Sequence, residues 1–349
     1  MTIRFNFKFL IYVTIICSPW IYAQMGNYPE YFQSVPKFYF EVLNYSSNQI
    51  DSSRLDVYIE VPYRSLHFIS KSGVFRADYE LTIGIYDSIN NLVQERTWLE
   101  EIQEKDYNES VSERMSRVSQ KSFTLKPAKY SINVQLQETE IKKGSSSSKT
   151  IIIRNFSQPS LALSDIMLVK RIDIEGDKKI IYPNISHKIG GSGDEFYLFY
   201  EIYNNCNADS ANIKISIKNF KGEIVLSDSN IQLVAGKNKS CFSKINTTQF
   251  VMGEYTAEVR LSSVDLNVDK SFEVMSVIAL KDFVIFWKGA PSSPIELENA
   301  LDPLIYLIDR DKLDEMKNAP PEKKKEMFKE FWETQDPTPD TDRNELKEE

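Results

Sequence analysis

The clearest pattern of apolar and polar positions lies in Val57–Asp87. Along Phe75–Ile85 every second residue is apolar or aromatic, and mostly polar residues fill the alternate positions. A period of two predicts a half-buried antiparallel strand. Leu66 and Phe68 belong to a partner strand, and Lys71–Gly73 joins the two strands, since glycine readily takes the positive φ that a tight turn needs. We therefore predict a central hairpin here.

Shorter runs of the same kind predict two β-domains. They are separated by turn-forming residues or polar linkers, as in sandwiches of antiparallel strands. A lead-in, 24–36, precedes the first domain, 37–156, and the second covers 157–276. The expected fold is therefore mainly β, with two antiparallel β-sandwich (Ig-like) domains in tandem.

Three segments qualify this picture. Glu195–Tyr203 is apolar on nearly both faces, which predicts a central strand. Glu101–Gln120 is polar and predicts a loop or a short helix. Lys143–Lys149 contains four consecutive serines and predicts a hairpin loop or an excursion at a sheet edge.

Towards the end of the chain the period becomes helical. Ser293–Glu296 forms a capping box with proline at the first helical position, and apolar residues follow at helical spacing. Pro320–Glu322 opens a second helix, whose apolar stripe includes Phe331 and Trp332. We assign 277–349 to a helical segment that follows the two β-domains.

The last residues of the chain carry a distinctive motif. It consists of Phe331 and Trp332, followed at fixed spacing by Asp336, Pro337, Thr338, Pro339, Thr341, Asn344 and Glu345. This run resembles the opening half of the GWxTD domain, a family of exported bacterial proteins with no established activity. Residues around the central hairpin are similar to the β-domain that often precedes it, and they include Arg64, His67, Arg76 and Asp78.

The resemblance implies an exported protein and assigns no role to these residues. The chain ends at Glu349, before the Gly-Trp-x-Thr-Asp signature of the family. Either the sequence is truncated or this member lacks the second half of the domain. Any role that depends on the signature is therefore open for this chain.

The N-terminus predicts export. Arg4 and Lys8 precede an apolar run over 9–16, and Ile21–Ala23 is an acceptable cleavage site, so we assign 1–23 to a signal peptide. An uncleaved anchor would be the only membrane contact, but the run is shorter than the ~20 residues of a membrane span. A lipoprotein site at Cys17 is disfavoured by the bulky residue before it. The expected location is periplasmic, outer-surface or secreted.

Charge and residue types limit the chemistry. The formal charge is −8, and removal of Arg4 and Lys8 makes it −10 (40 basic against 50 acidic residues), which disfavours nucleic acid as a partner. The chain has two histidines, neither at ligand spacing, so we expect no metal site and no cofactor. Cys206 and Cys241 remain after export, either as a disulfide or as two buried thiols.

Candidate catalytic groups are few. His67 lies between two apolar residues, which favours a strand-face position over a general base, because no nucleophile and orienting carboxylate accompany it. We therefore expect a non-enzymatic binding or scaffolding protein whose partners are other envelope proteins. One alternative is a hydrolase- or peptidase-like enzyme whose site is completed by a missing C-terminal half. The other is a carbohydrate-binding module that uses exposed aromatics such as Trp98.

Overall fold

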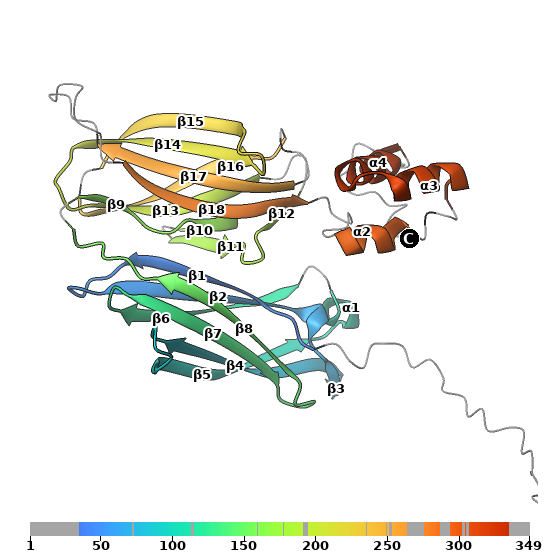
Figure 1. Cartoon of the computed structure of the whole chain (residues 1–349). Coiled ribbons are helices and arrows are strands. Elements are labelled where there is room, and N and C mark those ends of the chain that lie inside the picture. The colour runs from blue at the N-terminus through green and yellow to red at the C-terminus, as the bar shows by residue number, and fades with distance from the viewer. Residues whose placement is uncertain are drawn as a thin grey trace, which may run out of the picture. The chain divides into compact units, whose positions relative to one another are not determined.

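The computed structural model describes residues 35–334. Within this range the description omits 72, 113–114, 159, 177, 191–194, 235, 249, 251–252, 264–275, 287–293, 302–303 and 305–306. Strands dominate the described residues (Figure 1), so the predicted mainly β fold is confirmed. The expected signal peptide, the lead-in up to residue 34 and the motif Asp336–Glu345 lie outside the described residues.

The first sandwich consists of two antiparallel sheets (Figure 1). One has the order β1-β2-β6, formed by Tyr39–Ser46, Ser53–Pro62 and Ser116–Leu125. The other has the order β3-β4-β7-β8, with β5 also paired to β4; its strands are Ile69–Lys71, Val74–Tyr86, Lys129–Glu138, Gly144–Ile152 and, for β5, Leu92–Glu104. Two short helices, η2 (Tyr63–Ser65) and α1 (Tyr107–Ser110), lie in its connections.

The predicted hairpin is formed by β3 and β4, and Gly73 takes a φ of +79° in the turn. β4 is central because it pairs with both β5 and β7. Its apolar positions face the first core, where Leu81, Ile83 and Ile85 are fully buried. One expectation fails: Leu66, His67 and Phe68 lie in the connection between η2 and β3, so the partner strand is shorter than expected and His67 is not on a strand face.

The second sandwich also has two sheets. One has the order β11-β10-β13-β16, with β9 also paired to β13; its strands are Lys178–Pro183, Met167–Glu175, Glu195–Asn204, Asn238–Asn246 and, for β9, Leu161–Leu163. The other has the order β12-β18-β17-β14-β15, formed by Lys188–Gly190, Ser276–Phe286, Gly253–Ser263, Ser210–Asn219 and Ile224–Leu233. Their inner faces enclose a core with stacked and edge-on aromatic rings.

The boundary expected at 276 is wrong. β18 covers Ser276–Phe286 and pairs with β17 along its whole length, so the second sandwich extends about ten residues into the segment assigned as helical. Burial alternates along β18: Ala279, Phe283 and Ile285 are buried, while Ile278 and Leu280 are exposed. The sequence shows no matching alternation of apolar and polar residues, because the exposed residues Ile278 and Leu280 are apolar and the buried position 281 is a lysine.

The two uncertain polar segments also form structure. Residues 101–120 contain the end of β5, the four-residue α1 and the start of β6. The serine-rich segment forms β8, an edge strand paired to β7. No residue of β8 is buried and most are exposed, which suits their polar side chains.

Three helices follow the second sandwich: α2 (Pro294–Leu301), α3 (Arg310–Asn318) and α4 (Pro321–Thr334). They share a small core of their own made of Leu297, Leu301, Leu304, Leu313, Met316, Phe328 and Phe331. Phe331 is thus a packing residue. Trp332 lies on α4, but its side chain is outside the described part of the structure. No described helix is long and apolar enough to cross a membrane.

Candidate functional site: the junction of the two sandwiches

The outer faces of two sheets share an apolar cluster. Leu43 and Tyr45 of β1 pack with Met167, Val169 and Phe199 of β10 and β13, and all five are buried. This contact explains why β13 is apolar on both faces: one face belongs to the second core and the other to the junction. β13 pairs with β10 and β16, so the prediction of a central strand is confirmed.

Asn44 of β1 forms hydrogen bonds with the connection between the sandwiches. Its Nδ2 donates to the backbone oxygen of Arg54 (3.1 Å), and its Oδ1 accepts from the backbone N–H of Arg154 (2.7 Å). Its backbone N–H donates to Asp165 Oδ2 (2.8 Å), and the other oxygen of Asp165 accepts from the Arg154 guanidinium (2.6 Å). Asn44 is fully buried, so these bonds satisfy groups that water does not reach. Burial raises the pKa of Asp165, and Arg154 opposes that shift.

A second cluster surrounds Glu41 of β1. Its Oε2 accepts a hydrogen bond from Lys281 Nζ of β18 (2.5 Å), and it also pairs with His187. Burial alone raises the pKa of this carboxyl. The hydrogen bond to His187 and the charges of Lys281, His187 and Lys149 outweigh burial and lower the pKa from 4.5 to about 2. Glu41 is therefore an anion held among three basic side chains.

The lowered pKa predicts an acid dependence of stability. Because the folded state holds the Glu41 proton more weakly than the unfolded state, Glu41 stabilises the fold above about pH 4.5, and this contribution is lost as the pH falls through about 2. We expect the difference in free energy of unfolding between the protein and Glu41→Gln to shrink between these values. Urea titrations at several pH values measure it. A difference that stays constant down to pH ~2 would contradict the assignment.

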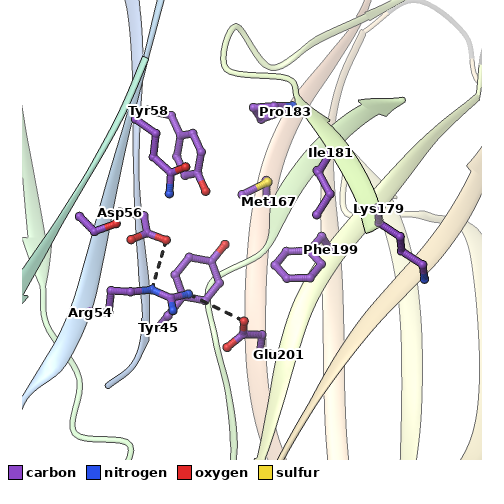
Figure 2. A pocket seen from close by; sticks show the side chains of 12 residues that line it. Tyr45, Arg54, Asp56, Tyr58, Met167, Lys179, Ile181, Pro183, Phe199 and Glu201 are labelled. Atoms are coloured by element: carbon purple, nitrogen blue, oxygen red, sulfur yellow. Dashed lines mark ion pairs between the residues drawn. The ribbon is translucent and has the colours of Figure 1, made fainter. Parts of the chain in front are cut away.

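A hollow of about 390 Å³ opens beside the apolar cluster (Figure 2). β1, β2 and β6 line one side, and β10, β11 and β13 line the other. The lining residues are Tyr45, Arg54, Asp56, Tyr58, Gln120, Ser122, Met167, Lys179, Ile181, Pro183, Phe199 and Glu201. Figure 2 shows aromatic and apolar side chains on both walls and the charged groups of Arg54, Asp56 and Glu201 together at one end.

Arg54 links the two sides of the hollow. Its guanidinium lies 3.2 Å from Asp56 Oδ2 and 3.8 Å from Glu201 Oε1, and it sits 4.7 Å from the centre of the Tyr45 ring. Among the residues that line the hollow, three buried polar atoms have no hydrogen-bond partner: Tyr45 Oη, Asp56 Oδ1 and Arg54 Nε, the last of which makes only the ion-pair contact with Asp56 Oδ2. Burial raises the pKa of Asp56, although a hydrogen bond to Ser122 and the charge of Arg54 act against this shift. Burial also raises the pKa of Tyr45 well above its usual value.

The residues singled out in the sequence lie elsewhere. Arg76 pairs with Asp78 on its own strand (2.8 Å) and with Glu101 across to β5 (3.2 Å). His67 Nδ1 lies 3.1 Å from Glu138 Oε1, and Glu138 Oε2 accepts from the His67 backbone N–H (2.8 Å). Arg64 belongs to η2 and, like these residues, is not among those that line the hollow.

Trp98 does not offer the free aromatic face that a carbohydrate module would need. Its indole N–H donates to Glu100 (2.9 Å), and the ammonium of Lys121 lies 4.5 Å from the ring centre. In β2, Asp56 and Tyr58 lie on the face opposite the core residues Leu55 and Val57, yet Asp56 is also buried. A polar or charged side chain on the second face of a strand is ordinary on a solvent-facing sheet, so the sequence alone does not point to the hollow.

The two cysteines are free thiols, Cys206 exposed and Cys241 buried. Cys241 pairs opposite Tyr200, whereas Cys206 follows the end of β13 at Asn204, so at least four extended residues, about 13 Å, separate them along the strand. A disulfide needs Cα atoms within ~7 Å. The geometry excludes the pairing that the sequence left open. Burial raises the pKa of the Cys241 thiol.

Thiol labelling tests this arrangement. We expect iodoacetamide to modify Cys206 in the folded protein and to reach Cys241 only after unfolding, because the thiolate is the reactive form and Cys241 is buried. Peptide mapping by mass spectrometry identifies the modified residue. Recovery of a peptide that joins the two cysteines would contradict the structure.

No group of three or more metal-ligating side chains occurs in the part of the chain that the structure describes. No family model and no curated protein matches the chain. Among solved structures, a red sea bream transglutaminase is 9% identical with a TM-score of 0.21, covering 71% of this chain and 31% of that one. Dimeric latent PorU from Porphyromonas gingivalis is 9% identical with a TM-score of 0.27, covering 75% and 21%.

A third solved structure, Escherichia coli alpha-2-macroglobulin activated by porcine elastase, is 10% identical with a TM-score of 0.22, covering 73% of this chain and 22% of that one. This chain spans between about a fifth and a third of the length of the three neighbours. At such low TM-scores the similarities carry no argument about function.

Proposed function

We propose that the protein is an exported component of the cell envelope that works by binding and scaffolding, without catalysis. Its partner surface is the edge strand β15 of the second sandwich. This strand ends the sheet order, and Ile224, Ile231 and Leu233 on it are 57%, 67% and 73% exposed. An edge strand has unpaired N–H and C=O groups, onto which an extended segment of another protein adds as a further strand.

The junction supports this role. Part-buried hydrogen bonds and the Arg154–Asp165 ion pair tie β1 to the described residues of the connection between the sandwiches, which suits a scaffold. Lys170 of β10 adds an ion pair to Glu60 of β2 (3.0 Å). The resemblance of the C-terminal motif to the GWxTD family and the export signal predicted at the N-terminus support the proposed location. The partners are then other exported proteins that present an apolar extended segment.

A site-specific photo-cross-linker in place of Leu233 tests the proposal in the native cells. We expect a reproducible adduct with one envelope protein. A cross-linker in place of Ile89, which is 77% exposed in a turn of the first sandwich, is the matched control and should give no adduct. The substitution Ile231→Lys should remove the Leu233 adduct, because a charge on the edge opposes strand addition. A protein that sediments only as a monomer and gives no adduct at Leu233 would refute it.

Location has its own test. Mass spectrometry of the chain from fractionated cells should find an envelope protein that begins at Gln24. An intact N-terminus in the cytoplasmic fraction would remove the export part of the proposal and leave the edge-strand part to the cross-linking result.

A further inference from the structure

We propose that the hollow at the junction of the sandwiches binds a neutral saccharide unit. This inference goes beyond the proposed function and does not depend on it, because β15 does not line the hollow. Three independent properties of the hollow lead to it: the charge of its lining, its unpartnered polar atoms and its apolar walls.

The charges of the lining cancel. Two cations, Arg54 and Lys179, accompany two anions, Asp56 and Glu201. Arg54 is held by both carboxylates, and Lys179 lies 4.8 Å from the ring centre of Phe242. A ligand with a net charge would lose hydration on entering, which costs several kcal/mol for an unpaired ion. A neutral ligand avoids this penalty.

The unpartnered polar atoms of the lining favour a ligand with hydroxyl groups. Tyr45 is 1% exposed, and its Oη has no hydrogen-bond partner among the described residues. Asp56 Oδ1, on the neighbouring strand, also lacks a hydrogen-bond partner. Figure 2 shows the Tyr45 hydroxyl directed towards the space between the walls. A phenol donates to an oxygen and a carboxylate oxygen accepts from an O–H, so hydroxyl groups are the hydrogen-bond partners that suit these two atoms.

The walls supply the apolar contact that a sugar ring also needs. Tyr58 and Phe199 present aromatic rings, and Met167, Ile181 and Pro183 complete the apolar surface. The C–H face of a pyranose packs on such surfaces while its hydroxyls point to the polar end. A volume of about 390 Å³ lies within the range of small-molecule pockets, ~300–1,000 Å³.

The test uses the purified chain labelled with ¹³C at its methionine methyl groups. Titration with neutral maltose and cellobiose is compared with glucuronate and glucosamine, which carry opposite charges. We expect a neutral disaccharide to shift the Met167 methyl signal, assigned with Met167→Leu, and to bind about ten-fold more tightly than either charged sugar. Absence of a shift with every neutral saccharide, or tighter binding of a charged one, would overturn the proposal.

Two matched variants separate binding from folding. Tyr45→Phe removes the unpartnered hydroxyl of the hollow. Tyr79→Phe removes an equally unpartnered hydroxyl from a fully buried tyrosine that lies outside the hollow. We expect Tyr45→Phe to weaken binding about ten-fold and Tyr79→Phe to leave it unchanged. Equal affinities in both variants would count against the proposal, and if Tyr45→Phe fails to fold, the Met167 shift in the unaltered chain decides.

Discussion

Replacing Phe283 by alanine is expected to reduce the free energy of unfolding by about 3–5 kcal/mol. Phe283 is 2% exposed on β18, and its ring stacks on Tyr255 at 5.7 Å between centres and contacts Phe196 at 5.2 Å. Truncation leaves a cavity that these rings cannot close, because closely packed interiors relax only in part. Urea denaturation followed by circular dichroism measures the loss.

Leu280→Ala is the control on the same strand. Leu280 is 61% exposed and faces away from the core, so its loss should change the free energy of unfolding by less than about 0.5 kcal/mol. The comparison tests whether β18 belongs to the second sandwich. If both substitutions had small effects, this strand would not be part of the core, and the earlier boundary at 276 would regain support.

The substitution Glu41→Gln is expected to cost about 3–5 kcal/mol at neutral pH. It keeps the shape of the side chain but leaves Lys281 buried without its anion, with His187 and Lys149 close by. An unpaired buried charge is costly because it has lost its hydration and gained no partner. The free energy of unfolding in urea, measured at pH ~7 where the carboxylate is ionised, gives the effect.

A double variant shows whether the loss of stability comes from the unpaired charge of Lys281. Glu41→Gln combined with Lys281→Met should recover most of the loss, because replacing both members of a buried pair removes the unpaired charge. Lys244→Met, which breaks the exposed ion pair with Glu195, should leave stability unchanged within error. A double variant as unstable as Glu41→Gln alone would show that packing, not charge, causes the loss.

Much of the strand content followed from local periodicity. The central hairpin was predictable because the buried positions of β4 alternate with polar ones and Gly73 supplies the turn. The central position of β13 was predictable from its two apolar faces. The end of the second sandwich was missed because β18 lacks an alternation of apolar and polar residues: Ile278 and Leu280 are exposed, and Lys281 occupies a buried position.

The residues of the junction could not be assigned in the same way. From the sequence alone, Lys281 would be assigned to the surface. In the structure it donates a hydrogen bond to Glu41, which lies 240 positions earlier in the chain. Likewise, Tyr45 and Asp56 occupy positions that alternate with core residues, where a polar side chain is ordinary on a solvent-facing sheet. Their burial depends on a second layer that the local sequence does not specify.

The sequence by itself therefore determined the strands, their alternation and the mainly β class, because these depend on which neighbouring residues share a face. Only the tertiary structure decided that the outer face of β1 and β2 is covered by β10 and β13. That contact turns solvent-facing positions into buried ones, and it creates both the charge cluster at Glu41 and the hollow beside Tyr45. The physical reason is that burial is a property of the pair of surfaces that meet, and distant segments of the chain contribute to each of them.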